Sequence, residues 1–304
     1  MRVAVVDLGT NTTRLLVADV DGRVEEVLRR TRITRLGEGV DDRRRLLPLP
    51  IARVRNCLAD YRRELEALGA ERTLLVATSA IRDAENGEAF LGEIEWSYGF
   101  TTRLLSGKEE AALTFRGVGA TDDATLVVDI GGGSTELIGA GLRTSLDIGS
   151  VRLTERHLPS DPPTATELES CAAAVRSELP DVHPERAIGV AGTITSLAAL
   201  DLDLAEYDSN RVHGHRMSVW GIERQLQRLA SLPLAERRRL PALDPERAPV
   251  IVAGAVILRE VLRHAALGEI EVSERDLLHG AALEAAKLPE PVEGDAPPGA
   301  YTCC

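Results

Sequence analysis

Apolar residues at the start of the chain form short runs that are separated by turn signals. Residues 3–7 and 14–20 are two such runs, and Asp21-Gly22 is a strong hairpin signal before a third run at residues 24–28. Residues 51–68 instead repeat their apolar positions at helical spacing. The pattern predicts three antiparallel strands at the edge of a sheet, followed by a helix.

The rest of the first half alternates between strand and helix patterns. The expected elements are a strand at residues 73–78, a helix from 82 to 95, a strand at 102–105 and a helix at 108–119. The resulting order βββαβαβα predicts an α/β unit with a mixed sheet.

The second half repeats this order after residues 120–123. Strands are expected at residues 126–129, 135–139, 143–148, 187–190 and 270–273, and helices at 150–158, 165–179, 194–200, 219–231, 248–266 and 277–288. We therefore expect an N-terminal domain at 1–120 and a C-terminal domain at 121–288, whose last helix is able to pack back on the first domain. The proline-containing tail, 289–304, is expected to be disordered.

An internal repeat connects the two halves. Residues 5–15 align without gaps on residues 127–137, with six of the eleven pairs identical, and each copy begins its own run of three strands. Two copies of one supersecondary unit predict a pseudo-symmetric pair of domains that face each other across a cleft.

The repeated turn suits phosphate binding. Asp7 and Asp129 each end a buried strand, and a glycine then lets successive backbone N–H groups point into the turn. The predicted phosphate-binding residues are Gly9, Thr10, Asn11 and Thr12 in the first copy and Gly131, Gly132, Gly133 and Ser134 in the second. One such turn alone is more simply explained as a tight hairpin, but a pair at the head of duplicated units favours phosphate, with Mg²⁺ held by the two Asp residues. Neither the Walker sequence GxxxxGK[ST] nor GxGxxG occurs.

The composition of the chain argues against some classes of binding partner. The net charge is −12, and only 2 Trp, 4 Tyr and 3 Phe are present, which argues against a nucleic-acid face and against membrane adhesion. The four cysteines have no metal-binding spacing, Cys303 and Cys304 are adjacent in the tail, and no apolar run approaches the ~20 residues of a membrane span. We expect a cytoplasmic protein. The acidic balance fits a polyanionic substrate only if metal and local arginines bind it.

The two loops, DLGTNT at residues 7–12 and DIGGGSTE at 129–136, resemble those of the exopolyphosphatase / guanosine pentaphosphate phosphohydrolase family. Three further segments support the resemblance, ATSAIRDA at 77–84, SGKEEA at 106–111 and AGTIT at 191–195. It covers residues 3 to about 288 and implies a short, two-domain member of the actin-like superfamily. The implied fold is two duplicated actin-like (ribonuclease H-like) domains, each with a mixed five-stranded sheet and flanking helices.

The resemblance also implies roles for particular residues. It makes Glu110 the general base that activates water and Arg82 a phosphate ligand. It places Asp129 and Glu136 in the catalytic centre, with Asp7, Asp129 and Glu136 as ligands of Mg²⁺ or Mn²⁺. A third glycine turn, Gly192 and Thr193, is implied to bind substrate.

The residues themselves help to choose Glu110 over its neighbour. Ser106-x-x-Glu109 fits a helix capping box, which gives Glu109 a structural task, whereas Glu110 points about 100° further round the helix. Without the resemblance, Glu110 would be taken as a solvated first-turn residue and Arg82 as a surface arginine paired with Asp83 or Glu85.

Other charged motifs favour structural explanations. His213-x-His215 has no evident third metal ligand, and the arginine runs 43–45 and 237–239 are typical of solvated charge. The segment Leu277-Leu278-His279-Gly280 departs from the Leu-Arg-Glu-Gly type common in the family, which weakens any expectation about contacts there.

The expected function is release of terminal orthophosphate from inorganic polyphosphate. Hydrolysis of guanosine pentaphosphate is the alternative that uses the same centre. An actin-like small-molecule kinase and a nonenzymatic nucleotide-binding protein are alternatives of other classes. We expect no nucleic acid or membrane partner, and a homodimer is expected from the resemblance only.

Overall fold

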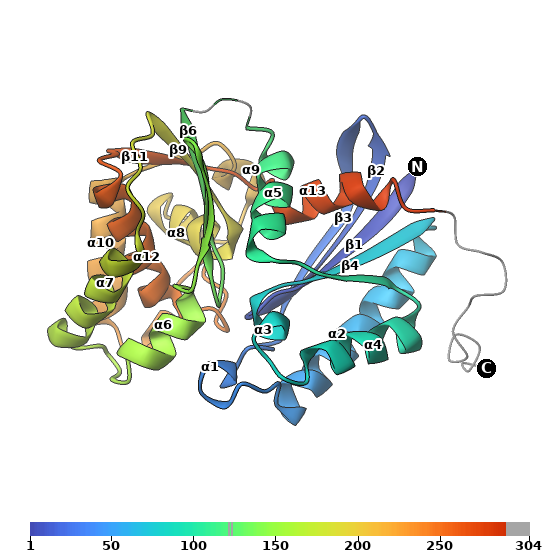
Figure 1. The fold of residues 1–304 in the computed structure, drawn as a ribbon. Helices are drawn as coiled ribbons and strands as arrows, with labels where there is room; N and C mark the ends of the chain where they lie inside the picture. Colours follow the sequence, from blue (N-terminus) through green and yellow to red (C-terminus); the bar gives the residue numbers. More distant parts are fainter. Residues whose placement is uncertain (121, 123, 290–304) are drawn as a thin grey trace. The chain divides into compact units, whose positions relative to one another are not determined.

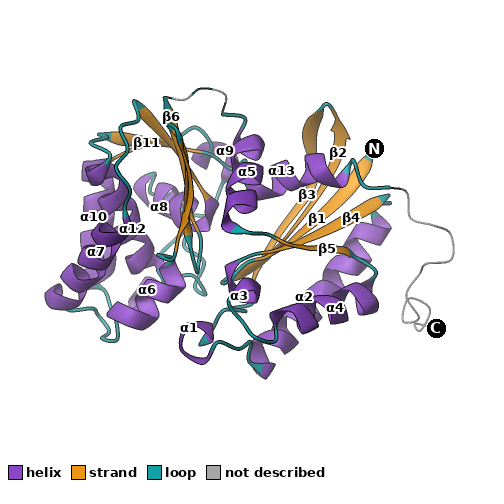
Figure 2. Cartoon of the chain, viewed as in Figure 1, coloured by secondary structure: helices purple, strands orange, loops and turns teal. Residues whose placement is uncertain are grey.

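The first sheet has five strands in the order β3-β2-β1-β4-β5 (Figures 1 and 2). Its strands are β1 (Arg2–Leu8), β2 (Thr12–Asp21), β3 (Arg23–Ile33), β4 (Arg72–Ala77) and β5 (Thr101–Leu104). The strands β1, β2 and β3 form an antiparallel meander, whereas β4 pairs parallel to β1 and β5 parallel to β4. The predicted mixed sheet of five strands is confirmed for this half of the chain.

The computed structural model describes residues 1–120, 122 and 124–289, and these form two units. The first unit is Met1–Gly117 together with the segment that starts at Leu277, and the second is Val118–Asp276. The sequence had placed the boundary after residue 120 and assigned residues 277–288 to the second domain by chain order. From residue 290 on, the tail expected to be disordered lies outside the described residues.

Helices cover both faces of the first sheet (Figure 1). One face packs on α2 (Pro48–Ala67) and α4 (Gly87–Tyr98), and the other on α5 (Gly107–Val118) and α13 (Leu277–Ala285). The side chains of β1 alternate between the two layers, so that Ala4, Val6 and Leu8 face one core while Val3 and Val5 face the other. Burial on both faces explains why β1 is apolar at almost every position.

The helix α13 lies against α5 without intervening side chains. A Cβ atom on Gly280 would stand 1.9 Å from the carbonyl oxygen of Leu113. Next to it, Nε2 of the buried His279 lies 2.9 Å from Oε1 of Glu26 on β3. The residues that depart from the family pattern therefore dock this helix on the first sheet.

The second sheet has six strands in the order β10-β11-β9-β6-β7-β8. They are β6 (Thr125–Ile130), β7 (Thr135–Gly139), β8 (Leu142–Leu146), β9 (Arg186–Val190), β10 (Arg216–Ser218) and β11 (Glu269–Val272). Strands β8-β7-β6-β9-β11 repeat the order and directions of β3-β2-β1-β4-β5, which is the duplication expected from the sequence. The sixth strand, β10, corrects the expected number of strands. With three residues, it is too short to leave a pattern in the sequence.

The helices of the second unit are α6 (Ser150–His157), α7 (Ala165–Glu178), α8 (Ala191–Asp201), α9 (Ser209–Val212), α10 (Val219–Ser231), α11 (Leu234–Arg237) and α12 (Ile251–His264). The helix α8 is buried from Thr193 to Leu200, because it contacts β6 and β9 as well as α12. A helix with apolar residues on every side is expected to be enclosed in this way.

Two local differences from the sequence expectation bear on the site. The single helix expected from residue 82 to 95 is two helices, α3 (Ser79–Arg82) and α4, because Gly87 packs against the end of α3. A Cβ atom there would stand 2.0 Å from the carbonyl oxygen of Ile81. A short helix, α1 (Val40–Arg43), lies between two residues in the left-handed conformation, Gly39 and Arg44. Among the described helices, none is long and apolar enough to cross a membrane.

Candidate functional site

The two glycine turns have the same hydrogen-bond geometry. The amide of Gly9 donates to the carbonyl of Thr12 at 2.9 Å, and the amide of Gly131 donates to the carbonyl of Ser134 at 3.0 Å. A Cβ atom on either glycine would stand 3.1 Å from that same oxygen. The sequence repeat is therefore a repeat of one tight turn, at the carboxyl ends of β1 and β6.

The carbonyl groups of the first loop accept hydrogen bonds from the segment that follows β3. Thr10 O accepts a hydrogen bond from the amide of Gly37 at 2.8 Å, and Asn11 O accepts from the amides of Thr34 and Arg35 at 3.0 and 2.9 Å. In a trans peptide the N–H of the following residue points opposite to the carbonyl. The amides of Asn11 and Thr12 are thus directed away from the segment that supports the loop, as an anion-binding turn requires.

The second loop is held in the same way by the start of α6. Gly131 O accepts from the amide of Ser150 at 2.9 Å, and Gly132 O accepts from the amide of Val151 at 2.8 Å. The Nε of Arg152 donates to Gly133 O at 2.8 Å. The amides that follow these three carbonyls are directed away from α6.

Two glycines that sequence reasoning missed make this support possible. A Cβ atom on Gly37 would stand 2.2 Å from Cγ2 of Thr10, and one on Gly149 would stand 2.3 Å from the carbonyl oxygen of Gly132. Each supporting segment therefore reaches its loop at a distance that only glycine allows. The available signal was a glycine close to a short helix, at Gly37 before α1 and at Gly149 as the N-cap of α6.

The first loop is linked to Arg82 and Glu110 within the first unit. Thr10 Oγ1 lies 2.8 Å from Oγ of Ser79, the first residue of α3. At the end of α3, Nη1 of Arg82 donates to Leu105 O at 2.9 Å and lies 3.6 Å from Oε2 of Glu110. The carboxylate of Glu110 is nearly buried, with its side chain 10% exposed. Sequence reasoning singled out Arg82 and Glu110 separately, and the structure places them in contact.

The neighbouring Glu109 caps α5. Its carboxylate accepts from the amide and the hydroxyl of Ser106 at 2.9 and 2.7 Å, and the Ser106 hydroxyl accepts from the amide of Glu109 at 3.3 Å. The Arg103 guanidinium and these Ser106 hydrogen bonds lower the pKa of Glu109 to about 2. The predicted capping box is confirmed for Ser106 and Glu109.

The two repeats differ at the position opposite their aspartate. Asp7 pairs across the sheet with Arg14, whose Nε and Nη2 lie 2.8 and 2.7 Å from Oδ2 of Asp7. At the same register in the second unit, Asp129 pairs with Glu136, and both are buried. Glu136 accepts a hydrogen bond from Ser145 at 2.7 Å. The first unit therefore places a cation beside its aspartate, whereas the second places a second carboxylate there.

Facing carboxylates are the better donor set for a divalent cation. Like charges directly opposite across a sheet are destabilising, and a bound cation removes that repulsion. Mg²⁺ is commonly held by one or two carboxylates together with water and substrate phosphates. Among the described residues, no group of three His, Cys, Asp or Glu side chains gathers at one place. Asp129 and Glu136 fit the metal as a pair, and Asp7 as a third ligand stays a prediction.

The turn at Gly192 and Thr193 is the first turn of α8 and not a separate loop. A Cβ atom on Gly192 would stand 1.6 Å from Nη1 of Arg247, so glycine makes room for that guanidinium. Thr193 is buried, and its methyl group packs where Gly254 of α12 lacks a side chain. Since β9 runs parallel beside β6, Arg247 lies at the same edge of the sheet as Asp129. Substrate binding by Gly192 and Thr193 stays a prediction.

The two histidines and the first arginine of the run 237–239 have structural partners. His215 Nε2 lies 3.0 Å from Oδ2 of Asp201, and His213 Nδ1 accepts from the amide of Glu274 at 3.2 Å. Arg237 is buried and pairs with Asp161 at 2.7 Å. That these two histidines do not form a metal site stays a prediction.

Comparison with known proteins shows which family the chain belongs to. Residues 15–288 match the model of the Ppx/GppA phosphatase family. The chain belongs to this family. Exopolyphosphatase 2 of Mycobacterium tuberculosis is 40% identical in an alignment that covers 94% of this chain and 98% of that protein. A guanosine-5'-triphosphate,3'-diphosphate pyrophosphatase of Vibrio atlanticus is 30% identical, over 92% of this chain but 58% of its own length.

Solved structures agree with this placement. An exopolyphosphatase-like protein superposes with a TM-score of 0.87 at 34% identity, covering 94% of this chain and 99% of its own. The Ppx/GppA protein of Aquifex aeolicus superposes with a TM-score of 0.78 at 31% identity, covering 94% and 98%. The family and the duplicated α/β fold expected from the sequence are confirmed, and so is the expectation that the chain is a phosphatase.

Proposed function

We propose that this phosphatase releases terminal orthophosphate from linear inorganic polyphosphate. The observation that carries the proposal is the pair of matched glycine turns, in which the carbonyls of residues 10, 11 and 131–133 accept hydrogen bonds from a supporting segment and the amides that follow them are directed away from it. Backbone amides in such a turn suit a chain of phosphates, since each non-bridging oxygen can accept more than one hydrogen bond.

In this proposal Glu110 activates the water. Its carboxylate accepts a proton from a water molecule as the water oxygen attacks the terminal phosphorus. The bond from that phosphorus to the bridging oxygen breaks, orthophosphate leaves, and the proton passes from Glu110 to solvent. Arg82 keeps the carboxylate in place through its 3.6 Å contact and presents further N–H groups to a phosphate oxygen. General base catalysis of this kind contributes ~10²–10⁴-fold in rate.

A divalent cation, Mg²⁺ or Mn²⁺, belongs to the proposal through Asp129 and Glu136. When bound there, it would neutralise charge on the phosphate oxygens. The acidic surface of the chain makes this neutralisation more important, because a net charge of −12 repels a polyanion at long range. We therefore expect strict dependence on the metal.

We propose polyphosphate rather than guanosine pentaphosphate as the substrate because of how much of each relative's length this chain covers. The chain covers nearly the whole of the mycobacterial exopolyphosphatase but little more than half of the Vibrio guanosine-nucleotide enzyme. Action in the cytoplasm and assembly as a homodimer remain predictions from the sequence.

Phosphate release from polyphosphate, guanosine pentaphosphate and ATP, each with Mg²⁺, tests the proposal. We expect the highest kcat/KM on polyphosphate and nearly complete loss in Glu110→Gln. A wild-type enzyme with no activity on polyphosphate would show the proposal to be wrong. Faster release from guanosine pentaphosphate would instead make that nucleotide the substrate of the same site.

A further inference from the structure

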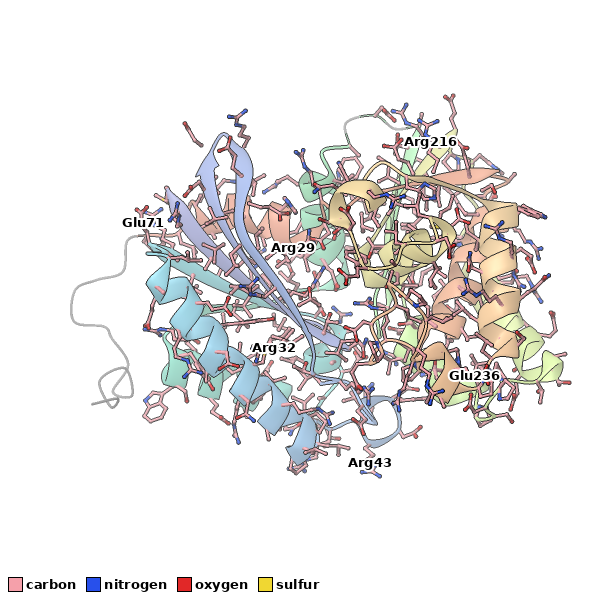
Figure 3. All side chains as sticks on the ribbon, turned by 180° about the vertical axis from the view of Figure 1, so that it is seen from behind. Arg29, Arg32, Arg43, Glu71, Arg216 and Glu236 are labelled. Atoms are coloured by element: carbon pink, nitrogen blue, oxygen red, sulfur yellow. The ribbon has the colours of Figure 1, made fainter. Side chains whose placement is uncertain are left out.

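Three consecutive arginines lie at the end of α1, in the first unit. Arg43, Arg44 and Arg45 are all exposed, and among the described residues none of them takes part in an ion pair. Figure 3 shows the side chain of Arg43 projecting away from the ribbon. Most arginines of this acidic chain are paired with a carboxylate, for example Arg55 with Glu93 and Arg176 with Glu260. Three adjacent unpaired guanidiniums are therefore a candidate anion site.

The backbone of this run is fixed between two parts of the candidate site. On one side, Gly37 bonds to the carbonyl of Thr10 in the first phosphate loop, and α1 follows after two residues. On the other side, Arg44 O accepts from the amide of Glu85 at 2.8 Å, just after the helix that carries Arg82. The four residues of α1 rise only ~6 Å, so the run stays close to both anchors.

Asn86 completes the second anchor. Its side-chain oxygen accepts from the amide of Leu46 at 2.8 Å, and its side-chain nitrogen donates to Leu46 O at 3.1 Å. The residues that follow the arginines are thereby bound to the turn between α3 and α4. A fixed backbone lowers the entropy cost of holding three cationic side chains near one ligand.

The acidic groups around the run limit the kind of ligand. Asp41 and Asp42 lie in the first turn of α1, and Glu85 and Glu88 follow Arg82 in sequence. A small anion would meet these carboxylates as well as the arginines, and it would gain little. A linear polyanion that already has its end in the phosphate loop can contact several guanidiniums in succession, each as a planar donor to phosphate oxygens.

The second arginine run of the chain differs in structure. Arg237 is buried and bonded to Asp161, so that this residue fixes a loop, whereas Arg238 and Arg239 are exposed. The two runs have the same composition, but only the run at 43–45 is anchored to a phosphate loop. Arg238 and Arg239 therefore serve as matched controls.

We propose that Arg43, Arg44 and Arg45 form a distal binding site for the phosphate groups of a linear polyphosphate chain. The site rests on the proposed function, and it makes the enzyme favour chains long enough to reach from the phosphate loop to the arginines. Tripolyphosphate, with three phosphate groups, is the short-chain comparison for this site.

The test compares the triple variant Arg43→Ala/Arg44→Ala/Arg45→Ala with the wild type on long-chain polyphosphate and on tripolyphosphate. We expect KM for the long chain to rise about tenfold, with KM for tripolyphosphate and both kcat values unchanged. The double variant Arg238→Ala/Arg239→Ala should behave as the wild type on both substrates. Replacement of all three residues 43–45 by Lys should restore most of the long-chain affinity.

Binding of fluorescently labelled long-chain polyphosphate to full-length protein, measured at low and high salt, gives a second readout. The triple alanine variant should bind more weakly at low salt, and the difference from wild type should shrink at high salt. An unchanged long-chain KM would overturn the inference, as would an equal rise for tripolyphosphate. A wild-type enzyme that hydrolyses neither polyphosphate would overturn the proposed function itself, whatever the binding result.

Discussion

Nη1 of Arg82 lies 3.6 Å from Oε2 of Glu110, and the same nitrogen donates to the carbonyl of Leu105 at 2.9 Å. The arginine thus joins α3, which is bonded to the first glycine loop through Ser79, to the helix that carries the candidate base. This contact gives Arg82 a positioning role in addition to the phosphate binding expected from the sequence.

Replacement of Arg82 should therefore affect turnover as well as binding. We expect Arg82→Ala to lower kcat by ~10²-fold, because a base displaced by about 1 Å loses alignment with its water, and to raise KM as a phosphate contact is lost. Steady-state kinetics on polyphosphate separates the two effects. An increase in KM with kcat unchanged would leave Arg82 as a substrate ligand only.

Adjacent glutamates on α5 allow a matched test of the base. Glu110→Gln should lose ~10²–10⁴-fold in kcat with little change in stability, since the amide keeps the volume of the side chain but accepts no proton. Glu109→Gln should keep kcat within a few-fold, while the melting temperature falls because the capping box loses a charged acceptor. Equal kcat values for wild type and Glu110→Gln would contradict the assignment of the base.

Metal binding by Asp129 and Glu136 can be measured without turnover. Mg²⁺ should raise the melting temperature of the wild type, because it binds the folded state, and Glu136→Gln should lose most of this rise. Without metal, Glu136→Gln should be as stable as wild type or up to ~1 kcal/mol more stable, because one of two facing carboxylates is removed. Gln keeps an oxygen that can accept from Ser145.

Asp7→Asn is the comparison for that experiment. If the metal is held by the second unit, the Mg²⁺-dependent rise persists in Asp7→Asn, although the variant is destabilised because the ion pair between Arg14 and Asp7 is lost. Loss of the rise in Asp7→Asn would instead support Asp7 as a ligand.

Support of the second glycine loop, residues 131–134, depends on Gly149. In Gly149→Ala the new Cβ would stand 2.3 Å from Gly132 O, so the loop or α6 must move. We expect a loss of ~1–3 kcal/mol in the free energy of unfolding and a KM for polyphosphate raised by at least ~10-fold. Gly92→Ala in α4 is the control, since no atom lies within 4 Å of its Cβ position, and the helix should become slightly more stable. Wild-type KM in Gly149→Ala would show that the loop does not bind phosphate.

The lowered pKa of Glu109 predicts a pH dependence of stability. The Arg103 guanidinium and the Ser106 hydrogen bonds favour the ionised carboxylate in the folded state, with a pKa of about 2 against an ordinary value of 4.5. The stabilisation is fully present above the ordinary value and is lost as the pH falls toward about 2. Urea unfolding of wild type and Glu109→Gln should thus differ at about pH 6 and converge near about pH 2 to 3. A constant difference would exclude this origin.

Much of the fold could be predicted because its signals are local. Apolar runs, the hairpin signal at Asp21-Gly22 and the repeated aspartate–glycine turn each depend on residues that are near one another in the chain. The capping box at Ser106 and Glu109 is of the same kind. The break between α3 and α4 was missed because it results from packing of Gly87 on Ile81, for which a pattern of apolar spacing gives no sign.

Within the candidate site, the sequence by itself determined the two tight turns, since spacing within one turn fixes where amides and side chains can point, and the roles of the carboxylates stay predictions. Only the tertiary structure decided what surrounds them. Gly37 supports the first loop from 27 positions away, Arg82 meets Glu110, and Asp7 has a cation as its partner while Asp129 has a carboxylate. Such contacts form when strands pair and helices dock, so they depend on which segments fold together and not on the order of residues within any one of them.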